Sequence, residues 1–181
     1  MSNRLEGKVA LVTACTRGIG RAIADLFVDE GAKVYYACRN METGKAAVEA
    51  ARARGGQAEL VYFEAHDPAT HRSMIDECIA KEGRLDVLVN NAGVSQKVTV
   101  ADMTLDDMKR IFNVNMFGLF LITQAVCEVM KKQKYGRIVS LSSVSGKRGG
   151  GVFGGAHYSA SKAAVLGFSK NLAREISEYG I

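Results

Sequence analysis

The chain has 181 residues, of which 48% are hydrophobic and 24% charged, and its net charge is +5. This length and composition are typical of one globular domain with a substantial core. No apolar run is long enough to span a membrane and the N-terminus has no signal-peptide region, so we expect a cytoplasmic protein without a membrane partner. The basic residues are scattered along the chain, which argues against a nucleic-acid partner.

Cysteines and histidines show no spacing that is typical of a metal site. The cysteines are far apart in the sequence, and the histidines do not pair with other candidate ligands. We therefore expect no metal ion. We expect free buried thiols in a reducing compartment at Cys15, Cys38, Cys78 and Cys127.

Strands and helices are expected to alternate along the chain. We predict strands at 8–13, 33–37, 59–63, 86–89 and 138–141. The first of them carries a short continuous apolar run, Val9–Val12, which suits a strand buried on both faces of a parallel sheet. Apolar residues at helical spacing predict helices ending at Gly31, over 41–54, after Asp67, from Thr104 to roughly Met130, and over 157–179. This alternation predicts an α/β fold, a Rossmann-type doubly wound parallel sheet, with residues 1–181 forming a single dinucleotide-binding domain.

The first turn follows a predicted strand and opens a helix, which is the context of a dinucleotide-binding loop. Glycines let the backbone approach a pyrophosphate, and the helix N-terminus offers free N–H groups to an anion. An ordinary tight turn is the alternative. The candidate cofactor-binding residues of this turn are Thr13, Ala14, Cys15, Thr16, Arg17, Gly18, Ile19 and Gly20.

The end of the second strand predicts which cofactor binds. An acid there binds a ribose 2′-hydroxyl, whereas an arginine accommodates a 2′-phosphate. The chain has Arg39 and no acid in Ala37-Cys38-Arg39-Asn40, and Arg17 precedes a glycine of the first turn. Two arginines near one phosphate favour NADP(H), while two solvated surface arginines are the alternative.

The segment Asn90-Asn91-Ala92-Gly93 follows the fourth predicted strand, at the sheet edge where ligands bind in such folds. A plain turn is also compatible, because Asn and Gly tolerate left-handed backbone. Asn90, Ala92 and Gly93 are candidate cofactor contacts. Asn115 lies in an apolar helical stretch, so it is either a structural polar anchor or part of a proton path.

Tyr158 and Lys162 are four residues apart in the last predicted helix and therefore share one helix face. A lysine ammonium there favours the ionised tyrosine, which suits proton exchange with an alcohol or carbonyl oxygen. Ser143 follows the fifth strand and offers a hydroxyl to a substrate oxygen. Each of these signals is weak alone, but together they form an ordered set on one topology.

These motifs resemble those of the classical short-chain dehydrogenase/reductase family over the whole chain. The family's cofactor loop is Thr-Gly, three residues, then Gly-x-Gly, and here Ala14 replaces the first glycine. We expect that change to be tolerated with a negative φ at Ala14. Asn-Asn-Ala-Gly stands unchanged at 90–93.

The resemblance implies a role for each candidate. Tyr158 is the catalytic acid or base, and Lys162 supports it and holds the nicotinamide ribose. Ser143 orients the substrate carbonyl, and Asn115 holds a water in the proton relay. Where the family often has an aspartate beside the adenine, this chain has Glu64-Ala65, with Asp67 as a possible substitute.

The resemblance implies an NADP(H)-dependent oxidoreductase that acts on a small carbonyl or secondary alcohol, most like a 3-oxoacyl thioester reductase. A sugar or polyol dehydrogenase of the same family and a non-catalytic nucleotide-binding module are the alternatives. The glycine-rich stretch 146–155 is expected to border the substrate. Lys147 and Arg148 within it either meet an acidic group of the substrate or, as we favour, belong to a solvated loop. Family members continue past Ile181, so we expect the missing C-terminal strands and substrate lid to lie there, and the full-length parent to be a homodimer or homotetramer.

Overall fold

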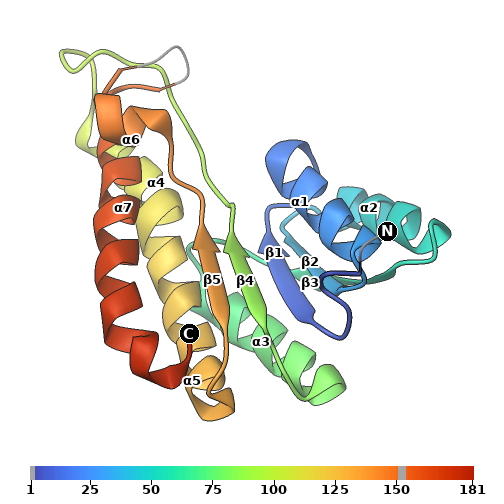
Figure 1. Cartoon of the computed structure of the whole chain (residues 1–181). Coiled ribbons are helices and arrows are strands. Elements are labelled where there is room, and N and C mark those ends of the chain that lie inside the picture. Colours follow the sequence, from blue (N-terminus) through green and yellow to red (C-terminus); the bar gives the residue numbers. More distant parts are fainter. Residues whose placement is uncertain (1–2, 151–153) are drawn as a thin grey trace.

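A parallel sheet with helices on both faces forms the centre of the protein (Figure 1). The computed structural model describes residues 3–150 and 154–181. Within them the sheet has five strands in the order β3-β2-β1-β4-β5, and every neighbouring pair is parallel. The strands are β1 Val9–Thr13, β2 Lys33–Cys38, β3 Gln57–Tyr62, β4 Val87–Asn90 and β5 Arg137–Ser140. The Rossmann-type fold expected from the sequence is therefore confirmed.

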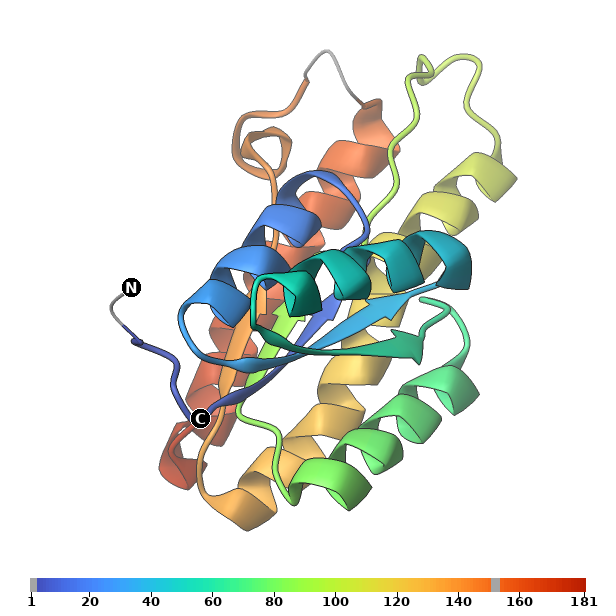
Figure 2. The same ribbon diagram turned by 90° about the vertical axis from the view of Figure 1, so that its right-hand side faces the viewer.

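Helices connect the strands and cover the sheet from two sides (Figures 1 and 2). They are α1 Gly18–Asp29, α2 Met41–Ala53, α3 Pro68–Glu82, α4 Leu105–Phe112, α5 Leu119–Gln133, α6 Val144–Arg148 and α7 Ala156–Ile176. A π-helix, η1 Asn113–Gly118, joins α4 to α5, and a 3-10 turn, η2 Ser177–Tyr179, follows α7. The boundaries differ from the sequence expectation by a few residues, and the single helix expected up to Met130 contains this π segment.

Alternate residues of β1 point to opposite faces of the sheet, as strand geometry requires. Val9 and Leu11 pack in the cluster that includes residues of α3 and α5, whereas Ala10 and Val12 pack in the cluster with α1 and α2. All five residues of β1 are buried, which is why this strand reads as a continuous apolar run. Two separate apolar layers therefore fix the sheet between its helices.

The sequence expectation that no apolar segment is long enough to span a membrane is wrong for the helical segment Leu105–Gln133, which has the length and composition of a span and a mean hydropathy of 1.4 in its most apolar window. However, 44% of that window is buried inside the protein. Core helices of water-soluble proteins pass the same test, so the finding is weak evidence for a membrane.

Candidate active site

The turn after β1 is fixed by hydrogen bonds to the two neighbouring strands. The backbone N–H of Ala14 donates to the Ala37 carbonyl over 2.8 Å, and the Asn91 side-chain amide donates to the carbonyls of Thr13 and Ala14. The Thr13 hydroxyl is buried and accepts from the backbone N–H groups of Asn91 and Ala92, both at 3.0 Å. These bonds hold the turn against the end of β4.

The expectation of a negative φ at Ala14 is wrong, because its φ is +54°. The hydrogen bonds to Ala37 and Asn91 fix both peptide groups of Ala14, so the backbone keeps the left-handed conformation that a glycine would adopt readily. For an L-residue this conformation costs about 1–2 kcal/mol. The alanine that replaces the family's glycine therefore has a strained backbone, and the replacement lowers the stability of the turn.

Glycine is required at Gly20 for close packing. A Cβ there would lie 2.8 Å from the Ala14 carbonyl oxygen and would also overlap the Asn91 amide nitrogen. Gly18 has a φ of +57° and faces open space. Helix α1 begins after Arg17 without a side-chain cap and without an acid in its first turn. Its first N–H groups are therefore available to an anion.

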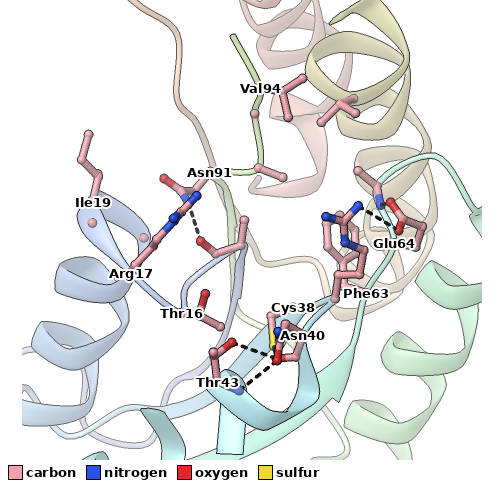
Figure 3. A pocket seen from close by; sticks show the side chains of 18 residues that line it. Thr16, Arg17, Ile19, Cys38, Asn40, Thr43, Phe63, Glu64, Asn91 and Val94 are labelled. Carbon is pink, nitrogen blue, oxygen red and sulfur yellow. Dashed lines mark hydrogen bonds and ion pairs between the residues drawn. The ribbon is translucent and has the colours of Figure 1, made fainter. Parts of the chain in front are cut away.

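A cavity of about 670 Å³ opens in front of this turn (Figure 3). It reaches from the first turn of α1 across the ends of β2, β3 and β4, which all lie at the carboxyl edge of the sheet. The sequence-predicted residues that line it are Ala14, Thr16, Arg17, Gly18, Ile19, Gly20, Arg39, Glu64, Ala65, Ala92 and Gly93. The structure thus brings together most of the candidate cofactor contacts around one hollow.

Five candidate cofactor contacts do not line this cavity, namely Thr13, Cys15, Asn90, Tyr158 and Lys162. Thr13 and Cys15 are buried behind it, and burial raises the pKa of the Cys15 thiol to about 12, which keeps it neutral. The Asn90 amide points to the other side of the strand and donates to the Thr123 hydroxyl over 2.9 Å. Its neighbour Asn91 lines the cavity instead.

Sequence reasoning missed several wall residues, namely Cys38, Asn40, Thr43, Phe63, Asn91, Val94 and Val114. Asn91 carried a usable signal, because successive residues at a strand end face opposite sides and one of the two asparagines had to face the ligand. Asn40 and Thr43 form the N-cap of α2, in which the Asn40 side chain accepts from the Thr43 N–H. That cap was also readable from the sequence.

The two arginines expected to meet one phosphate both line the cavity, but the structure does not place them side by side. In Figure 3, Arg17 lies near Asn91 and Ile19, while Glu64 lies on the opposite side. Arg39 pairs with Glu64, its Nη1 standing 3.7 Å from the Glu64 Oε2. An acid therefore reaches the Arg39 side of the cavity from β3, although β2 itself supplies none.

Lys162 of α7 connects the predicted catalytic residues to the cavity. Its side chain is buried, its Nζ donates to the Leu141 carbonyl over 2.7 Å, and burial lowers its pKa. A Cβ built on Gly93, which lines the cavity, would stand 3.4 Å from both the Lys162 Nζ and the Asn115 Oδ1. The ammonium and the amide therefore lie together just behind the cavity wall.

Asn115 in η1 is fully buried and uses its side-chain amide as an anchor. Its Oδ1 accepts from the Val94 N–H over 2.8 Å, and its Nδ2 donates to the Val94 carbonyl and to the Ser161 hydroxyl. Ser161 in turn donates to the Tyr158 carbonyl over 2.8 Å. Of the two roles left open for Asn115, these contacts support the structural anchor directly.

Helix α6, which Ser143 caps, packs against α7, which carries Tyr158 in its first turn. Figure 1 shows α6 beside the start of α7 at one end of the molecule. Ser143 is the N-cap of α6, and its hydroxyl accepts from the Ser145 N–H over 3.2 Å. A Cβ on Gly154 would overlap the Tyr158 ring, so the chain passes directly over that ring. Lys147 and Arg148 are exposed at the end of α6, and residues 151–153 of the glycine-rich stretch lie outside the described residues.

Comparison with known proteins identifies relatives of the whole chain. The family model described as short chain dehydrogenase matches residues 8–181. The chain is 39% identical over 176 residues to the 3-oxoacyl-(acyl-carrier-protein) reductase FabG of Escherichia coli strain K12, covering 97% of this chain and 70% of the relative. It is also 39% identical to a 3-oxoacyl-(acyl-carrier-protein) reductase of Synechocystis, with 98% and 71% covered.

Solved structures show the same fold. A short-chain type dehydrogenase/reductase from Mycobacterium marinum superimposes with a TM-score of 0.95 at 31% identity, covering 99% of this chain and 73% of that one. An NAD⁺-bound xylitol dehydrogenase superimposes with a TM-score of 0.93 at 30% identity, with 98% and 68% covered. The fold of this chain is therefore shared with solved members of this family.

Proposed function

Because the chain belongs to the short-chain dehydrogenase family of oxidoreductases, we propose that it is an NADP(H)-dependent enzyme that interconverts a carbonyl and a secondary alcohol. The observation that supports this most is the junction at Gly93. There the nucleotide-sized cavity meets the Lys162 ammonium of the helix that also carries Tyr158.

The first turn fits the pyrophosphate of a dinucleotide. Gly18 and Gly20 keep side chains away from the turn, and the N–H groups at the start of α1 have no acidic neighbour in the first turn to compete for them. An anion there also gains from the positive end of the helix dipole. The nicotinamide, when bound, supplies or accepts the hydride.

Three side chains then handle the substrate oxygen. Ser143 holds it by a hydrogen bond, and the Tyr158 hydroxyl donates a proton to it during reduction or takes one during oxidation. Lys162 stabilises the negative charge that Tyr158 acquires when it donates, and its burial strengthens that interaction because little water screens it. Asn115 and Ser161 keep the backbone of Tyr158 in place.

A 3-oxoacyl thioester is the substrate class that we propose, because two relatives at 39% identity are 3-oxoacyl-(acyl-carrier-protein) reductases. A polyol is the second candidate, because the xylitol dehydrogenase is a close structural neighbour. The homodimer or homotetramer and the cytoplasmic location expected from the sequence stay predictions.

Arg39 is the basis for proposing NADP(H), since it lines the cavity with its side chain 77% exposed and no acid lies in Ala37-Cys38-Arg39-Asn40. A charge-assisted hydrogen bond contributes roughly 1.5–3 kcal/mol, and about 1.4 kcal/mol is tenfold in affinity. Arg39→Asp should therefore lower the NADPH-to-NADH ratio of kcat/KM by one to two orders of magnitude, on this scale.

The measurement is steady-state turnover of a short 3-oxoacyl thioester and of xylitol with both cofactors. Arg72→Asp, which changes an exposed arginine of α3 outside the cavity, serves as the matched control and should leave the ratio unchanged. An unchanged ratio in Arg39→Asp would overturn the assignment of Arg39, and turnover of neither substrate class would overturn the substrate proposal.

A further inference from the structure

The carboxylate of Glu64 is held in a fixed orientation at the cavity wall. Its Oε1 accepts from the Ala65 N–H over 3.1 Å and stands 3.1 Å from the His66 Nδ1. The other oxygen, Oε2, is thereby turned toward Arg39, 3.7 Å from its Nη1. The Glu64 side chain is 19% exposed, against 77% for Arg39, so the acid is the fixed partner and the arginine is the free one.

The backbone of Glu64 is equally well anchored. Its carbonyl accepts from the Thr70 hydroxyl at 3.2 Å and lies 2.9 Å from the buried His71 Nε2, whose ring stacks on Phe63. Its N–H donates to the same Thr70 hydroxyl over 3.1 Å. These contacts hold the segment that carries the carboxylate in one conformation. The segment is therefore ordered before a ligand binds.

Sheet register brings Arg39 and Glu64 together. Cys38 of β2 pairs with Tyr62 of β3, and the Phe63 N–H donates to the Cys38 carbonyl over 3.0 Å. The next residues of both strands therefore emerge at the same edge, and both line the same cavity. The pairing of Arg39 with Glu64 therefore follows from the strand register, and both side chains lie at the cavity wall.

We propose that Glu64 is a specificity-determining residue that competes with a ligand's 2′-phosphate for the Arg39 guanidinium. This inference rests on the proposed function of the cavity as a dinucleotide site. A 2′-phosphate draws Arg39 away from Glu64 and meets the repulsion of the remaining carboxylate. A nucleotide with a free 2′-hydroxyl does not draw Arg39 away from Glu64 and is not repelled by the carboxylate. Glu64 thus lowers the ratio of the affinity for 2′-phosphorylated nucleotides to the affinity for nucleotides with a free 2′-hydroxyl. Without Glu64, Arg39 would make this ratio larger.

The test is a double-mutant cycle on this pair, with binding measured by calorimetry for two probes, 2′,5′-ADP and 5′-AMP. Glu64→Gln removes the charge while its amide oxygen still accepts from the Ala65 N–H. It should tighten 2′,5′-ADP binding by roughly five-fold, the scale of one exposed charge pair, and leave 5′-AMP unchanged. With Arg39→Gln already present, the gain should fall to about two-fold or less, the part due to direct repulsion.

Glu49→Gln is the matched control, because Glu49 is an exposed, lysine-paired acid of α2 outside the cavity. It should change neither affinity. The inference is overturned when Glu64→Gln leaves 2′,5′-ADP binding unchanged or weakens it. An equal loss for both probes would show that Glu64 contacts the adenosine instead. Wild-type protein that binds neither probe would overturn the proposed dinucleotide site itself, and this inference with it.

Discussion

Ala14 carries strain that the rest of the turn imposes on it. Its φ of +54° is held by hydrogen bonds to Ala37 and Asn91, and its side chain is an alanine where glycine would be relaxed. Replacing it with glycine removes about 1–2 kcal/mol of left-handed backbone strain from the folded state. Glycine also gives the unfolded chain more conformational entropy, which offsets about 0.4–1 kcal/mol of that gain.

Ala14→Gly should therefore raise the free energy of unfolding by up to about 1.6 kcal/mol. Denaturant titration measures this change. Ala80→Gly, in an exposed interior position of α3, is the control and should lower the same free energy by about 0.5–1 kcal/mol. A loss of stability in both variants would contradict the strain at Ala14.

At the scale of elements, the π-helix η1 ties the end of β4 to α7. Gly118, its last residue, approaches the loop after β3 so closely that a Cβ would overlap the Ala65 carbonyl. On the other side, Asn115 links the segment after β4 to α7 through its hydrogen bonds to Val94 and Ser161. Single-turn π segments are frequent at functional sites, and this one places a buried amide beside Lys162.

Asn115→Ala should destabilise the protein by about 2–4 kcal/mol, because it removes a fully buried amide and leaves the partly buried N–H and carbonyl of Val94 without their partner. Turnover should fall as well, since the α7 backbone at Tyr158 loses its link to β4. Ser161→Ala removes only one of the bonds to Asn115 and should cost about 1 kcal/mol. Urea unfolding and kcat are the measurements. Equal stability losses in the two variants would show that the Val94 contacts are not what Asn115 contributes.

The layered arrangement of the whole molecule could be predicted from the sequence, because it depends on patterns that repeat. A continuous apolar run predicted the fully buried β1, and the alternation of strands with helices predicted the parallel sheet, in which the carboxyl ends of the strands meet at one edge. That is why candidates as far apart as Gly18, Arg39 and Gly93 line one cavity.

Details that depend on register and on side-chain packing could not be predicted. The Arg39–Glu64 pair needs the β2–β3 register, which no local pattern specifies. The left-handed backbone at Ala14 follows from hydrogen bonds made by Ala37 and Asn91, far along the chain. The π segment in the helix expected up to Met130 ends at Gly118, where the chain packs closely against Ala65, and apolar spacing does not distinguish such a segment from an α-helix.

We propose that the cavity and helix α7 form one hydride-transfer site in which Tyr158 moves the proton. Tyr158→Phe tests it most directly, because the change removes the hydroxyl and keeps the ring that Gly154 covers. We measure kcat for reduction of a 3-oxoacyl thioester together with the Kd for NADPH, in the wild type and the variant. We expect kcat to fall by at least about 10²-fold, the lower range for loss of a positioned acid, while the Kd for NADPH stays within about two-fold. Substantial turnover in Tyr158→Phe at neutral pH would contradict it and would assign the proton to another group, such as Ser143.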